Sequence, residues 1–147
     1  MIDDEVIDPT STAIFGAIST DDLNSSAIAI LSEEDKAAVV ALPFGSALLI
    51  VKSGPSVGSR FLLNSQTITV GRHPDSDIFL DDVTVSRKHA IFEASNGGFL
   101  VRDAGSLNGT YVNRELVDTC ELSVGDEVQI GKFRLTYHTS VKGVNLD

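Results

Sequence analysis

From residue 46 onward, short apolar runs alternate with turn-forming residues. The runs are rich in β-branched and large apolar side chains, a composition typical of strands. Asn96-Gly97 lies between two of them and predicts a two-residue hairpin, because both central positions of such a turn need positive φ. No helix-length periodic segment follows, so the pattern predicts an all-β sandwich or barrel. The predicted strands lie near residues 47–52, 59–63, 67–71, 77–80, 89–94, 98–103, 109–113, 126–130 and 133–139.

The first 45 residues have a different character. Residues 1–20 contain few large apolar groups and no sustained period, which predicts disorder. Residues 32–41 predict a short helix, because Ser32 can cap it and a run of Ala and Val follows. Pro43 and Gly45 then interrupt the chain. We therefore expect an acidic regulatory tail and linker at 1–45, a β domain at 46–140 and a C-terminal tail at 141–147.

Charge is distributed unevenly between these parts. The chain has a formal net charge of −10, and residues 1–45 hold nine acidic residues and one basic residue, a net charge of −8. The β domain is therefore close to neutral. A strongly acidic chain disfavours general binding to nucleic acid or to an anionic membrane surface.

The sequence also bears on the compartment. Cys120 is the single cysteine, so an internal disulfide cannot form, and this fits a reducing environment. The first residues lack the basic start and apolar run of a secretory signal, and no apolar stretch reaches membrane-spanning length. We expect a cytoplasmic protein.

Three polar clusters join or end the predicted strands, at residues 71–77, 82–89 and 105–113. Loops held by a rigid sheet are where binding residues usually lie. Arg72 offers a planar fork of donors that matches phosphate oxygens. Ser86 adds a compact hydroxyl, and Arg87 adds a second positive charge. If the loops converge, these groups predict a phosphate-binding site.

The same clusters resemble the signature of the forkhead-associated (FHA) family. Gly71-Arg72, Ser86-Arg87-Lys88-His89 and Asn108-Gly109-Thr110 occur in the order and at the spacing of its three sequence blocks, and the resemblance covers about residues 46–140. It implies a β-sandwich of about eleven strands whose loops at one end bind a phosphothreonine peptide. It also implies that Arg72, Ser86, Arg87 and Asn108 bind this peptide, and that Gly71, His89, Gly109 and Thr110 support the site. Leu107 departs from the pattern, because family members often carry a phosphate-binding hydroxyl there.

Each residue taken alone has a simpler interpretation. Arg72 could form a surface salt bridge, Ser86 could be an ordinary turn residue, and His89 is more simply structural than a ligand. Four acids, Asp75, Asp77, Asp81 and Asp82, could suggest a calcium loop, but they lack the EF-hand spacing and its closing glutamate.

No catalytic, metal-binding or cofactor-binding set is predicted. Cys120 has no neighbouring His that would form a catalytic pair, and a nucleophile elbow is absent. The three histidines, His73, His89 and His138, are too scattered for a metal motif. We therefore expect a binding protein and not an enzyme.

Within the FHA family, residues 71–87 resemble an actinobacterial group that regulates glycogen accumulation and oxoglutarate dehydrogenase. Members carry two adjacent threonines followed by Ser-Val-Phe in an N-terminal tail. A serine/threonine kinase phosphorylates one of them, and the tail then folds back onto the FHA site. Here Ser11-Thr12-Ala13-Ile14-Phe15 occupies that place, so Thr12 is the predicted phosphorylation site, with Ser11 and Thr10 as secondary candidates.

The resemblance also implies partners. Unphosphorylated members bind and inhibit 2-oxoglutarate dehydrogenase, and some act on glutamate dehydrogenase and glutamate synthase. It therefore predicts a regulator in which phosphorylation of Thr12 switches off binding to these enzymes. The alternative is an adaptor that docks a phosphothreonine of a kinase or of another signalling protein.

Overall fold

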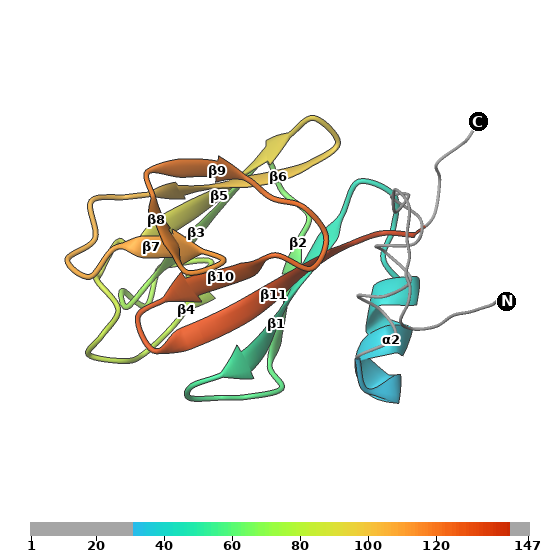
Figure 1. The fold of residues 1–147 in the computed structure, drawn as a ribbon, viewed down its shortest axis with the longest axis horizontal. Coiled ribbons are helices and arrows are strands. Elements are labelled where there is room, and N and C mark those ends of the chain that lie inside the picture. Colours follow the sequence, from blue (N-terminus) through green and yellow to red (C-terminus); the bar gives the residue numbers. More distant parts are fainter. Residues whose placement is uncertain (1–30, 142–147) are drawn as a thin grey trace, which may run out of the picture.

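The computed structural model describes residues 31–141, which contain eleven strands in two facing sheets (Figure 1). The six-stranded sheet has the order β2-β1-β11-β10-β7-β8, and the five-stranded sheet has the order β4-β3-β5-β6-β9. All neighbouring strands with a recorded register are antiparallel except β3 and β4, which run parallel. The strands of the first sheet are β1 (Ala47–Ser53), β2 (Arg60–Leu63), β7 (Thr110–Val112), β8 (Glu115–Val117), β10 (Glu127–Ile130) and β11 (Phe133–Thr139). Those of the second are β3 (Thr67–Gly71), β4 (Ile78–Phe79), β5 (Ala90–Ser95), β6 (Gly98–Asp103) and β9 (Thr119–Glu121). The predicted all-β sandwich is confirmed.

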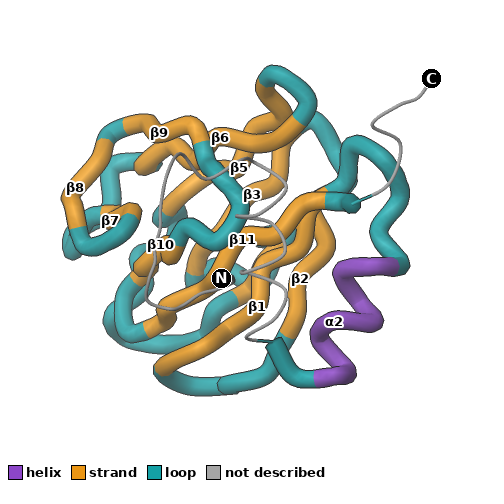
Figure 2. Tube along the Cα trace, turned by 45° about the vertical axis from the view of Figure 1, so that its right-hand side comes forward, coloured by secondary structure: helices purple, strands orange, loops and turns teal. Residues whose placement is uncertain are grey.

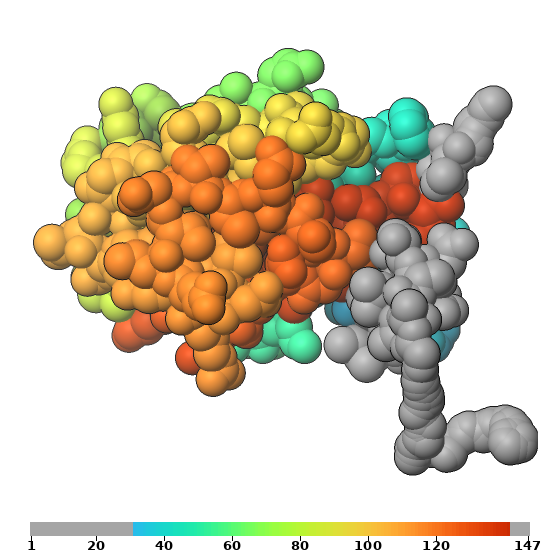
Figure 3. Space-filling model, turned by 45° about the horizontal axis from the view of Figure 1, so that its top comes forward, coloured from blue at the N-terminus to red at the C-terminus, as the bar shows by residue number. Residues whose placement is uncertain are grey.

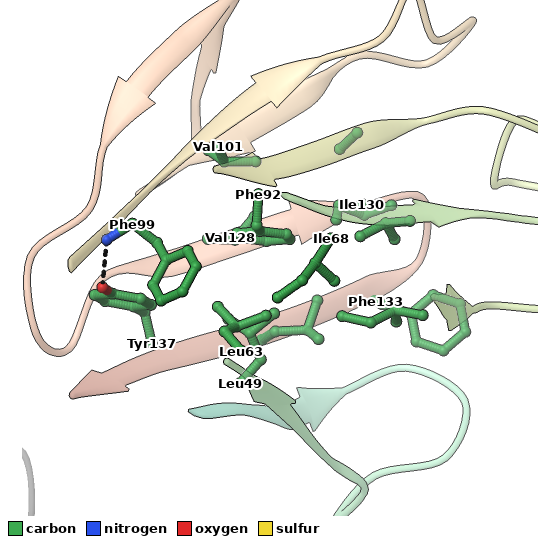
Figure 4. Close-up of a cluster of buried hydrophobic side chains, with 14 of the residues drawn as sticks. Leu49, Leu63, Ile68, Phe92, Phe99, Val101, Val128, Ile130, Phe133 and Tyr137 are labelled. Atoms are coloured by element: carbon green, nitrogen blue, oxygen red, sulfur yellow. Dashed lines mark hydrogen bonds between the residues drawn. The ribbon is translucent and has the colours of Figure 1, made fainter. Parts of the chain in front are cut away.

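The core lies between the sheets and is formed by the inward-facing apolar side chains of the strands. In β11, for example, Phe133, Leu135 and Tyr137 are buried in the main cluster (Figure 4). The Tyr137 hydroxyl accepts a hydrogen bond from the backbone N–H of Phe99 over 2.9 Å, and this bond joins the two sheets. Burial raises the pKa of Tyr137 to about 12, even though the Phe99 N–H acts in the opposite direction. The Tyr137 phenol is therefore neutral and reaches across the core from one sheet to the other.

The predicted hairpin is confirmed, but the sequence pattern did not reveal two of the strands. Asn96 and Gly97 have φ of 50° and 82° and connect β5 to β6. Strands β8 and β9, in contrast, were not predicted. They contain three residues each, and most of their positions are exposed, so they carry no apolar alternation that sequence reasoning could detect.

A single helix, α2 (Glu33–Val40), precedes β1 within the part of the chain that the structure describes. Its predicted cap is confirmed, since Ser32 Oγ accepts a hydrogen bond from Asp35 N over 3.1 Å. The helix lies on the outer face of the first sheet (Figure 2). There Val39 joins a small buried cluster with Leu48. An ion pair of 3.0 Å between Asp35 and Arg60 fixes it further. The predicted phosphorylation site Thr12 and its neighbours Ser11 and Thr10 lie outside the described residues.

Candidate functional site

The three predicted loop clusters meet at the end of the sandwich opposite α2 (Figure 1). We call this end the tip and define it by the loops at residues 72–77, 80–89 and 104–109. Figure 3 shows the yellow-green and the orange segments that contain these loops packed against each other at that end. Segments more than thirty residues apart in sequence therefore form one surface.

The loop after β3 is joined to the loop before β5 by backbone hydrogen bonds. Arg72 N donates to Ser86 O over 2.9 Å. At Gly71 the two chains approach so closely that an added Cβ would lie 2.0 Å from the carbonyl oxygen of Arg87. A side chain at residue 71 would push the two loops apart, so this position requires glycine.

Two further bonds attach the third loop. Ser86 Oγ accepts a hydrogen bond from Leu107 N over 2.9 Å. Asn108 Nδ2 donates to Thr84 O over 2.9 Å. Because a backbone carbonyl only accepts, the NH₂ group of Asn108 must face Thr84, and its side-chain oxygen stays available as an acceptor. Likewise, the Ser86 hydroxyl accepts from Leu107 and still has its own hydrogen to donate.

The tip carries three exposed basic side chains beside four aspartates. Arg72 is exposed and uses Nε to donate to Val85 O over 3.0 Å, which fixes the guanidinium. Neither terminal nitrogen has a hydrogen-bond partner among residues 31–141. Arg87 and Lys88 are also exposed, and neither side chain forms an ion pair with any residue between 31 and 141. Positive groups of this kind attract an anion.

His89 is fully buried and lies between two of the loops. Its Nδ1 accepts a hydrogen bond from Ser86 N over 3.1 Å, and its Nε2 lies 2.9 Å from Gly109 O. Since a backbone N–H only donates and a carbonyl only accepts, the imidazole must be neutral with its hydrogen on Nε2. His89 therefore connects the loop of Ser86 to the loop of Asn108 and does not reach the surface.

Gly109 turns the chain directly after Asn108. Its φ of 86° lies in the left-handed region, and an added Cβ would lie 2.6 Å from Leu116 Cδ1. Both the backbone conformation and the close neighbour favour glycine. Thr110, the next residue, is buried, and its hydroxyl donates to Asp103 Oδ1 over 2.7 Å.

Asp103 organises the third loop, and sequence reasoning missed it. Its Oδ1 accepts from the hydroxyls of Ser106 and Thr110, and its Oδ2 accepts from the backbone N–H groups of Gly105 and Ser106. Burial raises the pKa of Asp103, but these hydrogen bonds outweigh it and hold the pKa below its usual value. An Asp at the end of a predicted strand, with Gly105 and Ser106 two and three residues further on, was the available signal, since Asp often bonds backbone N–H groups two residues on.

The acids considered as a calcium loop have other partners. Asp77 Oδ2 accepts from Thr69 N over 2.9 Å. Asp82 accepts from both the backbone and the hydroxyl of Thr84, and these bonds hold the pKa of the Asp82 carboxyl below its usual range. Between residues 31 and 141 there is no group of three His, Cys, Asp or Glu side chains arranged to hold a metal ion.

Two hollows lie near the tip. One of about 220 Å³ is lined by Thr84, Asn108, Tyr111 and Lys132 among others, and so lies directly beside Asn108. A larger one of about 410 Å³ lies beside His73 and Lys88 and contains none of the predicted phosphothreonine-binding residues. Of the two hollows, only the smaller one is therefore lined by a predicted phosphothreonine-binding residue.

Comparison with known proteins supports the resemblance. Residues 68–131, which hold all three sequence blocks, match the FHA domain model. The glycogen accumulation regulator GarA of Mycolicibacterium smegmatis is 58% identical over 132 residues, which cover 90% of this chain and 83% of the relative. The chain belongs to this family of FHA domain proteins.

Two further matches extend this assignment within the FHA family. An oxoglutarate dehydrogenase inhibitor of Corynebacterium jeikeium is 64% identical over 101 residues, which cover 69% of this chain and 70% of the relative. Among solved structures, one from a structural and functional analysis of phosphothreonine-dependent FHA domain interactions matches with a TM-score of 0.61 and 27% identity. That match covers 66% of this chain and 99% of the other. In residues 31–141, no helix has the length and apolar character needed to cross a membrane.

Proposed function

We propose that this chain is a non-catalytic regulator whose tip binds phosphothreonine. One observation carries the proposal: Arg72, Ser86 and Asn108 come from three separate loops and lie at one end of the sandwich with unused hydrogen-bonding groups. The roles follow from these groups. The terminal nitrogens of Arg72, the hydroxyl of Ser86 and the charge of Arg87 bind the phosphate, and the side-chain oxygen of Asn108 accepts from a backbone N–H of the peptide.

The other positions of the three sequence blocks act through these residues. Gly71 permits the approach of the Ser86 loop, and Gly109 permits the turn after Asn108. His89 and Thr110 hold the loops together from inside. We assign them as positioning residues of the phosphothreonine site.

The expected affinity is useful but modest. A phosphate carries about −1.5 to −2 charges at neutral pH. Hydrogen bonds to a charged group contribute about 1.5–3 kcal/mol each. Leu107 provides no hydroxyl to the phosphate, so two or three such bonds carry the binding.

We further propose that the ligand is the chain's own tail, phosphorylated at Thr12 by a serine/threonine kinase. The docked helix α2 sets the length of the tether, because the 20 residues from Ala13 to Ser32 must reach the opposite end of the domain. Fully extended, they span about 66 Å. As a flexible chain they span roughly 25 Å. A compact domain of this size has a radius of gyration of about 13 Å, so the tip is within reach.

A tether of this kind gives an effective concentration on the order of mM. If the site has an intrinsic dissociation constant near 1 μM, the tail-bound form would then outnumber the open form about a thousandfold. This ratio is equivalent to roughly 4 kcal/mol. Capture of the phosphorylated tail would exclude any partner that uses the same surface.

For the partner of the open form we propose 2-oxoglutarate dehydrogenase, because relatives at 64% identity are oxoglutarate dehydrogenase inhibitors. Glutamate dehydrogenase and glutamate synthase are further candidates through the resemblance described above. These enzymes and kinases would place the protein in the cytoplasm.

The test is to phosphorylate Thr12 in the full chain and record amide spectra. Self-capture predicts shifts around Arg72, Ser86 and Asn108 that are independent of protein concentration. Arg72→Ala should abolish the shifts, whereas Arg102→Ala, which removes an exposed arginine paired with Glu93, should not. Shifts that grow with protein concentration would instead support an adaptor that docks other phosphoproteins, and shifts that survive Arg72→Ala would contradict the phosphothreonine site.

A further inference from the structure

The larger of the two hollows, with a volume of about 410 Å³, has no part in the phosphothreonine site proposed above. Its size falls within the range of about 300–1,000 Å³ that is typical of small-molecule sites in proteins. The residues that line it come from β3, from β5 and from the loops next to these strands, so it lies where the second sheet meets the tip. The chemistry of this lining indicates which ligand it suits.

Much of the lining is aliphatic. Thr69 and Ile91 are register partners in β3 and β5. They face away from the core, because their neighbours Val70 and Ala90 belong to the buried cluster. Ala104, which follows β6, adds a short side chain that fills little of the space. An apolar group of a ligand would be removed from water here, which favours binding.

Two opposite charges line the same hollow. Lys88 is exposed, and the Asp75 side chain is 92% exposed. No ion pair joins the two, and Lys88 pairs with no carboxylate between residues 31 and 141. Because these charges do not neutralise each other by direct contact, a ligand that lies between them can interact with both.

The hollow also has unused hydrogen-bond donors. His73 Nδ1 accepts a hydrogen bond from Asp75 N over 3.0 Å, so the neutral ring carries its hydrogen on Nε2. Within the described chain, no residue accepts from this Nε2 or from the hydroxyl of Ser76. The Thr69 hydroxyl, in contrast, already donates to Asp77 Oδ2 and accepts from Asp77 N. His73 and Ser76 therefore add donors for an anionic group beside Lys88.

The remaining acids of the tip loops do not alter this balance of charge. Asp77, Asp81 and Asp82 do not line the hollow. Asp77 accepts from the backbone and hydroxyl of Thr69, and Asp82 accepts from those of Thr84. The lining thus holds one formal positive and one formal negative charge.

This pairing selects a class of ligand. A simple anion would be repelled by Asp75, and a simple cation would be repelled by Lys88. A zwitterion has a partner for each of its charges.

We propose that this hollow binds a free α-amino acid with an aliphatic side chain. The carboxylate of the amino acid lies against Lys88 and accepts hydrogen bonds from His73 and Ser76. Its ammonium group lies against Asp75, and its side chain packs on Ile91 and the other apolar residues of the lining.

The proposed site borders the phosphothreonine site and is distinct from it. His73 directly follows Arg72, and Lys88 directly follows Arg87. His73 N also donates to Arg87 O over 3.3 Å, so one hydrogen bond connects the two sites. Binding of an amino acid nevertheless does not rest on the phosphothreonine function, because no predicted phosphothreonine-binding residue lines the hollow.

The experiment titrates the full, unphosphorylated chain with L-leucine and follows the amide spectra. N-acetyl-L-leucine lacks the ammonium group, L-leucinamide lacks the carboxylate, and glycine lacks the side chain. The variants Lys88→Gln and Asp75→Asn each remove one charge from the lining. The matched controls are Lys132→Gln and Asp81→Asn, which remove exposed charges that do not line this hollow.

We expect leucine to cause saturable shifts of the amides of Thr69, Ile91 and Ala104. Each analogue should bind at least tenfold more weakly, as should each of the two charge variants, because each lacks one charged or apolar contact. The control variants should bind leucine as the unchanged protein does. Their amide spectra, and those of the charge variants, should otherwise show an intact fold.

The proposal would be overturned if no saturable shifts appeared up to about 10 mM leucine, or if leucine and N-acetyl-L-leucine bound equally. A synthetic peptide of residues 6–20 phosphorylated at Thr12 supplies a further test. Shifts of the same three amides with this peptide but not with leucine would show that the hollow extends the peptide site, which also contradicts the proposal. Binding of the phosphopeptide by the unchanged protein, and its loss in Arg72→Ala, decide the phosphothreonine function separately.

Discussion

The hydroxyl of Thr110 donates a hydrogen bond of 2.7 Å to Asp103 Oδ1, which links the start of β7 in one sheet to the end of β6 in the other. The same carboxylate accepts from Gly105, Ser106 N and Ser106 Oγ, so the whole loop that presents Asn108 is built around one anion. The shape of the tip thus depends on a residue outside the predicted phosphothreonine-binding set.

Replacing Asp103 with Asn should loosen this loop. One carboxylate oxygen becomes an NH₂ group that faces donors, so the free energy of unfolding should fall by about 1–3 kcal/mol, measured by urea denaturation. Because the folded pKa of Asp103 is lowered, its contribution is present above the unfolded pKa and is lost as the pH falls through the folded pKa. The difference between the two proteins should therefore shrink below about pH 4. If the Asp103→Asn variant and the unchanged protein were equally stable at neutral pH, the proposed role of Asp103 in holding the loop would be wrong.

His89 should be seen by NMR as a neutral ring protonated at Nε2, because its neighbours are a donor at Nδ1 and an acceptor at Nε2. Long-range proton–nitrogen spectra of the ring distinguish the two tautomers. Substitution by Ala leaves Ser86 N and Gly109 O without these partners, and we expect a loss of about 2–4 kcal/mol in stability. A ring protonated at Nδ1 at neutral pH would show that the assigned hydrogen bonds are wrong.

His138 makes a separate prediction for stability at low pH. It is 2% exposed on the sheet face that α2 covers, and its Nδ1 has no hydrogen-bond partner among the described residues. Burial lowers the pKa of His138 to about 4, with Asp35 raising it and Lys52 lowering it further. The unfolded chain therefore takes up the proton first. The contribution of neutral His138 to the free energy of unfolding is complete above about pH 6.5. It is lost as the pH falls toward 4, by roughly 3 kcal/mol in total.

The variant His138→Leu removes this titration. Its stability relative to the unchanged protein should rise steadily as the pH is lowered from 6.5 to 4, measured by urea denaturation at each pH. Their difference at pH 7.5 serves as the reference for substitution effects unrelated to protonation. A difference that stays constant across this range would mean that His138 is accessible to solvent in the folded protein.

The docking of α2 can be tested by hydrogen exchange. Val39→Asp places a charge in the small cluster that holds the helix, which is separate from the main core. Amides of residues 36–42 should lose protection, whereas those of β5 and β6 should keep it. Ser32→Ala, which removes only the cap, should have a smaller effect of about 1 kcal/mol. Loss of protection throughout the domain would show that the helix is an integral part of the fold.

The sequence predicted those parts of the fold that carry a local signal. Strands such as β10 alternate half-buried and buried side chains, and Asn96-Gly97 determines its turn, so both were found. Strands β8 and β9 form by pairing with β7 and β6 and are not specified by their own composition. Both were therefore missed. The predicted helix was found as well, but its packing against Leu48 is a tertiary contact that residues 32–41 alone do not reveal.

For the site, the residue types were predictable and their mutual contacts were not. Arg72 and Ser86 stand out by chemistry, and the spacing of the three blocks links them to the FHA family. That Ser86 Oγ accepts from Leu107 N, however, depends on the approach of two loops that are far apart in sequence. Asp103 was overlooked because a single acid at a strand end has many ordinary interpretations.

The two ends of the described chain have a practical consequence. Ser140 Oγ donates to Leu42 O over 2.8 Å, so the segment that leaves β11 lies beside the segment that follows α2, at the end away from the tip. A fusion partner, or a linker to a solid surface, joined after residue 141 will therefore attach the domain at the end opposite the tip. Immobilised in this way, the protein presents Arg72 and its neighbours to the solution, and a binding sensor built on it needs no redesign of the loops.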